Sequence, residues 1–395
     1  MKSFNNHVSR IFSKRALAIT GTALLLGGCS VIPKTGPAET TGPIAGPTPE
    51  PSATALPTDA TRHRVALLVP MGGNTAAVGQ SLANATTMAL LDTNANNIRI
   101  TTYDTSKGAG AAARKAIADG NKLILGPLLA DNVPAVQAAA RPARVPAIAF
   151  SNDIRVASAD VFLMGHVPEQ SINRSVQYAR ARGSNNFAAI VPEGAYGQRS
   201  FDALNSALSQ YGGTLIGSAK YARGNTSIVS AAQRLRAAGG YDTVLIADGA
   251  RLATQAAGEI KRSGAEGTRI LGTELWSGES VLTRSSAVNG AIFSAVSDRR
   301  YKRFADSYEA RFGNKPYRIA TLGYDSVLLT LRVARDWRVG RNFPTSMLFD
   351  KGGFLGVDGP FRFNRTGIAE RALEVREVRG SSVVSVDAAP TSFSD

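Results

Sequence analysis

The central part of this chain alternates between short apolar runs and longer amphipathic segments. The run 65–69, Val-Ala-Leu-Leu-Val, is continuously apolar and stops at Pro70, which is typical of a strand buried on both faces of a parallel sheet. A glycine-rich turn and a helical segment over 76–92 follow it. The order continues with strands at 98–104, 123–125 and 145–150 and helical segments at 110–119 and 131–140. This alternation predicts an α/β fold with helices on both faces of a parallel sheet.

The alternation breaks near 161–168 and then starts again. Helices are predicted at 169–182, 196–211, 228–236 and 251–263, and strands at 187–191, 214–221, 243–247 and 269–272. Two long helices, 301–312 and 319–337, and short strands near Phe361 and at 373–378 complete the chain. Two similar units followed by further helices and strands indicate two lobes between which the chain crosses more than once.

The first 29 residues have the layout of an export signal. Basic residues at Arg10, Lys14 and Arg15 precede an apolar run over 16–26, and Gly27-Gly28-Cys29 follows. The run is shorter than the roughly 20 residues that span a bilayer. The two glycines before the only cysteine resemble the lipobox of bacterial lipoproteins. That resemblance implies a signal peptide over 1–28 and a lipidated Cys29. An ordinary signal peptide, or a buried helix with a free thiol, is the alternative.

The segment after Cys29 has the composition of a tether. Residues 30–61 contain seven prolines and seven threonines and almost no large apolar side chains. Such a segment cannot bury a core and is expected to be extended and disordered. With Cys29 it forms a predicted tether over 29–61, which would let the folded part stand away from the membrane.

The net charge of the chain indicates which classes of partner it can have. The chain carries 45 basic and 30 acidic side chains, a net charge of +15. Removal of 1–28 takes away four bases and no acid, which leaves 41 bases against 30 acids and a net charge of +11. Export makes anionic lipid headgroups or the acidic cell envelope better partners than nucleic acid, and no nucleic-acid partner is expected.

The sequence lacks the motifs of the common catalytic and cofactor sites. Three scattered histidines and one cysteine do not form a zinc pattern. The glycine- and alanine-rich stretch 108–113 imitates a dinucleotide fingerprint, but the next strand ends at Leu125 without the required acid. No nucleophile elbow or P-loop occurs. We therefore expect no metal, no cofactor, no catalytic residue and no enzymatic activity.

Three stretches carry a resemblance to a known family. Residues 65–92 (VALLVPMGGNTAAVGQSLANATTMALLD), 103–153 and 188–208 resemble, in this order, successive parts of the type I periplasmic binding proteins of the branched-chain amino-acid-binding group. The resemblance covers about 62–380. It implies two doubly wound parallel-sheet lobes joined by a multi-crossover hinge. Lobe 1 would contain 62–168 with about 298–350, and lobe 2 would contain 169–297 with about 351–385. Residues 386–395 would be a disordered tail.

The resemblance also implies a ligand site between the lobes, where strand carboxyl ends and helix N-termini suit anions and carboxylates. Ser151 would hydrogen-bond a ligand carboxylate or amine, Tyr196 would cover the ligand, and Glu274 would pair with an ammonium group. Each also has a purely structural interpretation. Ser151 could only end a strand, Tyr196 could pack as an aromatic residue of the hinge, and Glu274 could be a solvated loop acid. The full set of candidates is Asn74, Thr75, Ser151, Asn152, Tyr196, Asp248 and Glu274.

Two departures from the family pattern weaken the case for an amino-acid ligand. Leu128, Leu129 and Ala130 stand where the family has small hydroxyl residues that hold a carboxylate. Asp248 stands where amino-acid binders often have an aromatic or small polar residue.

Two binding functions follow from these features. The first is a lipid-anchored regulator, similar to the lipoprotein activators of penicillin-binding proteins, whose partner is a peptidoglycan synthase. The second is a substrate-binding lipoprotein that delivers a branched-chain amino acid or a related small molecule to an ABC transporter. The tether, and Ser30 after the lipidated cysteine, favour the regulator at the periplasmic face of the outer membrane. The activators often carry an additional N-terminal helical domain that this sequence does not show.

Overall fold

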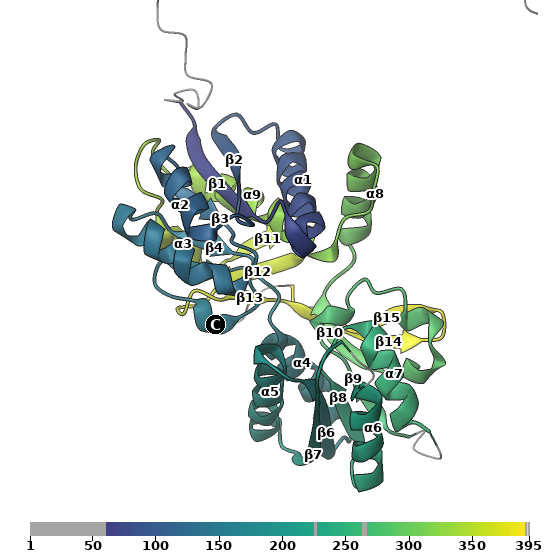
Figure 1. The fold of residues 1–395 in the computed structure, drawn as a ribbon. Coiled ribbons are helices and arrows are strands. Elements are labelled where there is room, and N and C mark those ends of the chain that lie inside the picture. The colour runs from purple at the N-terminus through teal and green to yellow at the C-terminus, as the bar shows by residue number, and fades with distance from the viewer. Residues whose placement is uncertain (1–60, 225–226, 263–266, 392, 394–395) are drawn as a thin grey trace, which may run out of the picture. The chain divides into compact units, whose positions relative to one another are not determined.

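The computed structural model describes residues 61–224, 227–262, 267–391 and 393. The predicted signal peptide, Cys29 and nearly all of the predicted tether lie outside these residues. The described residues form two α/β lobes, each with its own central sheet, which confirms the predicted fold (Figure 1). Among the described residues, none of the helices combines the length and the hydropathy that crossing a bilayer requires.

The sheet of lobe 1 has five strands in the order β2-β1-β3-β4-β5, and all neighbours are parallel. Helices α2 and α3 cover one face, and α1 and α9 cover the other. Helix α8 packs against α1. The elements are β1 (His63–Val69), α1 (Ala76–Asp92), β2 (Ile98–Asp104), α2 (Ala109–Ala118), β3 (Leu123–Leu125), α3 (Val133–Ala140), β4 (Ala147–Ala149), β5 (Val161–Leu163), α8 (Tyr301–Phe312) and α9 (Thr321–Ala334).

The sheet of lobe 2 has seven strands in the order β15-β14-β10-β9-β8-β6-β7. The five strands from β10 to β7 are parallel, and β14 and β15 add an antiparallel edge. Helices α4 and α5 cover one face, and α6 and α7 cover the other. The elements are α4 (Pro168–Ala181), β6 (Asn186–Pro192), α5 (Ala195–Tyr211), β7 (Thr214–Tyr221), α6 (Ser227–Ala238), β8 (Thr243–Ile246), α7 (Ala250–Ile260), β9 (Arg269–Leu271), β10 (Ile292–Val296), β14 (Leu373–Arg379) and β15 (Ser382–Asp387).

The burial of the strands on both faces explains why the apolar runs in the sequence predict them. In β1, Val65, Leu67 and Val69 enter the core under α1 and α9, whereas Ala66 and Leu68 enter the core under α2 and α3. Successive side chains of a strand point to opposite faces, so a strand covered on both faces must be apolar at every position.

In each lobe, a glycine lets the helix that follows the first strand approach that strand closely. A Cβ at Gly79, in α1, would lie 1.8 Å from the carbonyl oxygen of Pro70, which follows β1. A Cβ at Gly197, in α5, would lie 1.7 Å from the carbonyl oxygen of Pro192, the last residue of β6. Glycine is the residue that permits such close contact of helix and strand. The two lobes therefore share one strand–turn–helix geometry.

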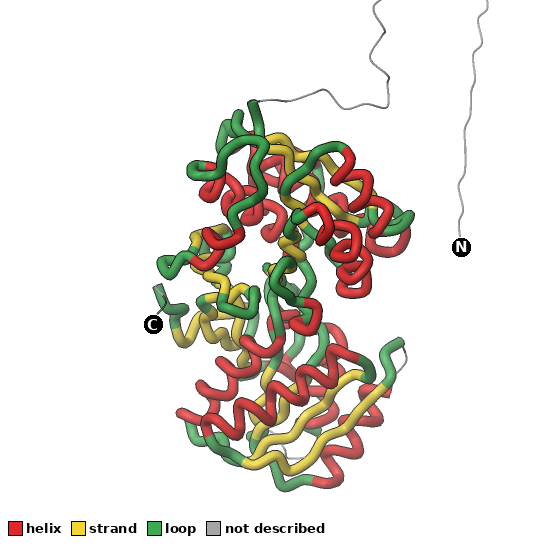
Figure 2. The backbone as a smooth tube through the Cα atoms, turned by 90° about the vertical axis from the view of Figure 1, so that its left-hand side faces the viewer, coloured by secondary structure: helices red, strands yellow, loops and turns green. Residues whose placement is uncertain are grey.

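The chain crosses between the lobes three times: after β5, after β10 and at Ala372, between β13 and β14 (Figures 1 and 2). A small antiparallel sheet precedes the third crossing, and its side chains belong to the lobe 1 core. Its strands are β11 (Phe354–Gly356), β12 (Gly359–Phe363) and β13 (Ala369–Arg371).

The structure corrects several expected boundaries. Residues 354–371 pack on lobe 1, so the expected return to lobe 2 at about 351 is wrong, and the crossing comes at Ala372. The predicted break near 161–168 contains β5, and β10 was not predicted. Strand β15 ends at Asp387, so the expected tail from 386 begins inside a strand.

Candidate functional site

Tyr196 and Glu274 meet at the edge of lobe 2 that faces the hinge. Tyr196 lies in the first turn of α5, and Glu274 opens a short 3-10 turn after β9. The Tyr196 hydroxyl donates to Oε1 of Glu274 at 3.0 Å and lies 3.0 Å from Oγ1 of Thr273. Trp276 anchors this turn, because its buried indole donates from Nε1 to the carbonyl oxygen of Asp248 at 3.0 Å. Two candidates from distant parts of the sequence are thus directly bonded.

Glu274 is a half-buried residue, and one oxygen of its carboxyl group is enclosed. Its Oε2 is closed off from solvent and has no hydrogen-bond partner among the described residues. Burial raises the pKa of Glu274 to about 8, against the opposing effect of the Tyr196 hydrogen bond. The group is therefore mainly protonated at neutral pH. A ligand ammonium would have to displace that proton before it could form the ion pair that the family resemblance implies.

The carboxylate of Asp248 accepts hydrogen bonds from three groups of lobe 2. The donors are the hydroxyl of Tyr221, Nε of Arg223 at 2.8 Å and the backbone N–H of Gly249 at 2.7 Å. Arg223 also lies over the ring of Tyr196, with 5.5 Å between its guanidinium carbon and the ring centroid. Asp248 therefore supports the Tyr196 side of the site through Arg223.

A buried arginine joins the two lobes next to Ser151 and Asn152. The Ser151 hydroxyl accepts from the backbone N–H of Asp153 at 3.0 Å, so it stabilises the turn after β4. Arg199 of α5 donates to the carbonyl oxygen of Asn152 and lies 3.7 Å from Oδ1 of Asp153. The same guanidinium pairs with both carboxylate oxygens of Glu169, at 2.7 and 2.9 Å. Arg199 and Glu169 belong to lobe 2, so this network spans the gap to lobe 1.

The remaining candidates lie at the lobe 1 edge. Asn74 is exposed and Thr75 half-buried in the turn before α1, and Thr75 makes no side-chain capping bond. Leu128 packs on the lobe 1 core, and Leu129 is 40% exposed. The structure connects Tyr196 with Glu274 directly and places Asp248 behind them, and it places Ser151 and Asn152 opposite Arg199. It does not bring Asn74 and Thr75 into these networks.

Sequence reasoning missed a buried charged cluster at the hinge. Asp358, in the turn between β11 and β12, has no exposed surface. Its carboxylate accepts from Nη1 of Arg318 at 2.7 Å and from the hydroxyl of Thr321 at 2.8 Å, and it lies 2.9 Å from Nε2 of His166. The backbone N–H of Asp358 donates to Oδ2 of Asp325 at 3.2 Å.

The two carboxyl groups of the cluster, Asp358 and Asp325, have pKa values shifted in opposite directions. Burial opposes the ionisation of Asp358, but Arg318 and His166 outweigh it and hold the pKa of Asp358 well below its usual range. Burial and the neighbouring Asp358 raise the pKa of Asp325. Burial lowers the pKa of His166. Asp358 is therefore the ionised acid that neutralises Arg318.

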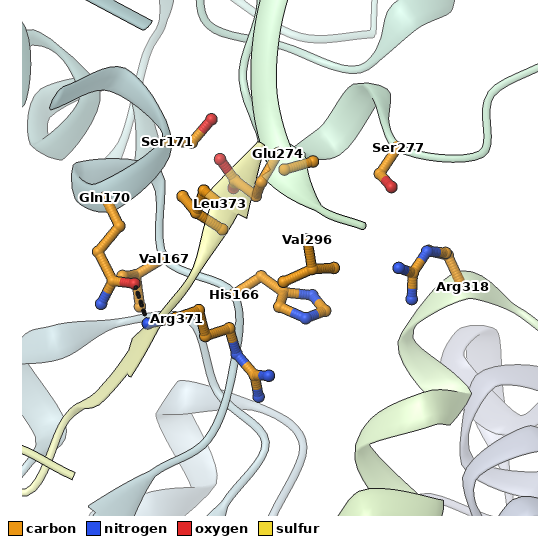
Figure 3. Close-up of a pocket in the computed structure, with 11 residues that line it drawn as sticks. His166, Val167, Gln170, Ser171, Glu274, Ser277, Val296, Arg318, Arg371 and Leu373 are labelled. Carbon is orange, nitrogen blue, oxygen red and sulfur yellow. Dashed lines mark hydrogen bonds between the residues drawn. The ribbon is translucent and has the colours of Figure 1, made fainter. Parts of the chain in front are cut away.

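A cavity of about 30 Å³ lies beside this cluster, with room for only a few water molecules (Figure 3). It touches all three crossings and the Glu274 turn, so it connects the hinge with the lobe 2 site. The described residues contain no group of three or more His, Cys, Asp or Glu placed to hold a metal ion. The lining residues are His166, Val167, Gln170, Ser171, Glu274, Ser277, Ala295, Val296, Arg318, Arg371 and Leu373.

Comparisons with known proteins agree with this architecture. The periplasmic binding protein family matches residues 63–380, and the chain belongs to that family, which implies a periplasmic location. The solved leucine-binding protein LivK of Thermotoga maritima is similar in fold, with a TM-score of 0.64 and 18% identity over 83% of this chain and 98% of that one. At this identity the likeness is one of fold. The family and this neighbour are binding proteins.

Two curated relatives are more similar in sequence over a shorter stretch. An uncharacterised protein of Rickettsia prowazekii is 29% identical over 153 residues, 38% of this chain and 41% of that protein. The penicillin-binding protein activator LpoA of Photobacterium profundum is 26% identical over 154 residues, 38% of this chain and 25% of that protein. The chain thus spans less than half the length of either relative.

Proposed function

We propose that this protein is a non-catalytic, lipid-anchored protein of the periplasm whose bilobed domain binds a peptidoglycan synthase and raises its activity. The lipid on Cys29 would hold it at the outer membrane, and the segment up to residue 61 would let the domain reach its partner.

The observation that carries this proposal is the self-pairing of the residues expected to bind an amino acid. Tyr196 bonds Glu274, and Arg223 bonds Asp248. Arg199 bridges from Glu169 to the carbonyl oxygen of Asn152 across the two lobes. A domain whose lobes are joined by its own side chains can present a constant surface to a protein partner without a solute. The similarity to LpoA supports this choice of partner.

The alternative is a receptor that passes a branched-chain amino acid to an ABC transporter. The similarity in fold to LivK favours it, and so does the unpartnered Oε2 of Glu274, which a ligand could use. The absence of hydroxyl side chains at Leu128 and Leu129 weighs against it.

A reconstituted synthase assay tests the proposal. The purified protein is added to a purified peptidoglycan synthase of the same organism, and incorporation of a labelled cell-wall precursor is followed. We expect a saturable increase of several-fold in rate. Arg199→Gln should reduce the increase because it breaks the bridge between the lobes, whereas Arg141→Gln, which removes an exposed ion pair within lobe 1, should not.

The synthase assay, combined with a measurement of ligand binding, can reject the proposal. An unchanged synthase rate, combined with a rise in melting temperature in leucine or isoleucine that Ser151→Ala abolishes, would establish the receptor instead. The protein is unfolded and refolded beforehand so that any carried ligand is lost. A ligand at a hundred times its dissociation constant stabilises the fold by ~2.7 kcal/mol, which thermal unfolding detects readily.

Cys29→Ala tests the anchor. We expect this variant to fold normally but to leave the membrane fraction, because a thioether-linked lipid cannot form without the thiol. Fractionation of cells producing the wild type and the variant, with an immunoblot of each fraction, measures the change. Retention of the variant in membranes would contradict the anchor without affecting the proposed synthase partner.

A further inference from the structure

We propose that the amino edge of the lobe 1 sheet docks on an anionic phospholipid membrane, and that a pocket in this edge takes the phosphate of one lipid headgroup. The amino edge lies opposite the carboxyl ends of the strands, which Asn74, Leu128 and Ser151 follow. The proposal goes beyond the synthase partner, and it uses the proposed lipid anchor only as the reason why this edge would be near a membrane. We define the amino edge as residues 61–64, 93–97, 119–122, 141–146, 157–160 and 335–342.

These segments lie together because of the sheet topology. All neighbouring strands of the lobe 1 sheet are parallel, so the segments that lead into β1, β2, β3, β4 and β5 lie at one edge. Trp337, after α9, stacks on His63, the first residue of β1, with 3.9 Å between the ring centroids. This contact brings 335–342 to the same edge.

The amino edge is strongly basic. It contains eight bases and three acids, a net charge of 8 − 3 = +5. The bases are Arg62, Arg64, Lys122, Arg141, Arg144, Arg335, Arg338 and Arg341, and the acids are Asp119, Asp160 and Asp336.

Two of the three acids already have partners. Oδ2 of Asp160 lies 2.8 Å from Nε of Arg141. Asp119 accepts a hydrogen bond from the Tyr103 hydroxyl at 2.8 Å, and it lies 3.3 Å from Nζ of Lys115. The basic side chains therefore exceed the acids that could neutralise them at this surface. Five of them are exposed to solvent: Arg141, Arg144, Arg335, Arg338 and Arg341.

A pocket of about 200 Å³ opens on the amino edge at the start of β1, and it is large enough for a phosphate group with part of its glycerol. Its lining includes Arg62, Arg64 and Lys122, which are half-buried, and no acidic residue among those that the structure describes. The Lys122 ammonium makes no hydrogen bond or ion pair with the described residues. Burial lowers the pKa of His63, so the positive charge of the pocket comes from the other three side chains.

Two features favour a membrane over a soluble anion. Val339, which lines the pocket, is 44% exposed, and the exposed Arg338 and Arg341 flank it in sequence. An apolar side chain among basic ones suits the boundary between headgroups and acyl chains. The described chain also begins at Thr61, beside this pocket, so the segment from Cys29 joins the fold at the surface that would face the membrane (Figure 1).

Vesicle binding tests the proposal on a chain without lipid. Residues 29–395 with Cys29→Ser keep every described helix and strand. Cosedimentation is measured with vesicles of phosphatidylcholine alone and of phosphatidylcholine with one third phosphatidylglycerol. We expect binding to the anionic vesicles to be at least tenfold stronger and to weaken with added salt, because salt screens exposed charges. Equal binding to both vesicles, or binding to neither, would overturn the proposal.

A pair of substitutions locates the contact. Arg62→Gln with Lys122→Gln removes two charges of the pocket and should weaken binding about 25-fold, which is about fivefold for each charge near an anionic surface. Arg64 is kept, because its Nη1 donates to the carbonyl oxygen of Asp119 at 2.7 Å and so supports the end of α2.

The matched control removes the same two charge types from lobe 2. Lys220→Gln with Arg234→Gln changes two exposed residues, and it should leave binding nearly unchanged at roughly 0.1 M salt, where the Debye length is about 10 Å. An equal loss of binding in both double variants would mean that net charge alone drives binding, and it would overturn the assignment to the amino edge.

The two tryptophans of the chain locate the contact without any change of charge. Trp337 lines the pocket, whereas Trp276 is buried in lobe 2. Brominated phosphatidylglycerol quenches only tryptophans that lie near the lipid, so it should quench the emission of the bound chain but not that of Trp337→Phe. A bound chain that brominated lipid does not quench would contact the membrane elsewhere, which would overturn the proposal.

Purified peptidoglycan is the competing occupant. If it binds and anionic vesicles do not, and if Arg62→Gln with Lys122→Gln weakens that binding, the edge belongs to the cell wall and membrane docking is wrong. These outcomes are independent of synthase activation, which needs no vesicles, and of the lipid on Cys29, which this chain lacks. Docking through charge is reversible, so it would not hold Cys29→Ala in membranes washed with salt.

Discussion

Asp358→Ala is expected to lower the free energy of unfolding by about 3–5 kcal/mol, which is the usual cost of removing one partner from a buried ion pair. The substitution leaves Arg318 without its 2.7 Å partner in a place where neither residue meets water freely, and it removes acceptors from Thr321 and His166. Chemical denaturation of the purified protein, followed by circular dichroism, measures the change.

Two further variants make this result interpretable. Asp306→Ala removes an exposed carboxylate that lies 2.7 Å from Lys302, and it should cost at most about 1 kcal/mol. Asp325 could ionise once Asp358 is gone and so replace part of the lost charge, because Asp358 is one of the groups that raise its pKa. The double variant Asp358→Ala, Asp325→Asn closes that route and should be less stable than the single variant. A loss below 1 kcal/mol in both would contradict the structural role given to the cluster.

Glu274→Gln is expected to stabilise the protein at alkaline pH and to flatten part of its pH dependence. Glu274 has a pKa of about 8 when folded and 4.5 as its usual value. At a pH between these two pKa values, Glu274 has lost its proton in the unfolded chain but still holds it in the folded chain. The free energy of unfolding therefore falls as pH rises from about 4.5 to 8, by about 1.4 kcal/mol per pH unit. Glutamine keeps the acceptor for Tyr196 and has no proton to lose.

Unfolding free energies measured from pH 5 to 9 for the wild type and Glu274→Gln give the test as a difference. The difference isolates Glu274 from two other buried groups. Asp325, with its raised pKa, contributes a fall of the same sign. His166, with its lowered pKa, contributes a rise of stability with pH below its usual value of 6.5. Parallel pH profiles for the two proteins would mean that Glu274 is ionised in the folded state, as an ammonium-binding acid would be.

The sequence could predict those features of the candidate site that depend on which residues follow each strand. Tyr196 opens the helix after β6, and Glu274 opens the turn after β9, and parallel strands bring such positions to one edge. The direct bond between their side chains, and its effect on the charge of Glu274, needed coordinates. Asp248 could be placed at the same edge, yet its pairing with Arg223 and Tyr221 could not, because both partners lie at the end of β7, whereas Asp248 follows β8.

The two α/β lobes could be predicted from the apolar runs alone, because a strand covered on both faces must be apolar at each position, as 65–69 is. The place where the chain returns to lobe 2 could not be predicted in this way. The strands of 354–371 are only three to five residues long, and their place is set by packing against lobe 1. The hinge cluster follows from that packing, since His166, Arg318, Asp358 and Arg371 stand far apart in a chain where charged residues usually remain in water. They become buried because three crossings meet around them, and burial is a property of the assembled fold.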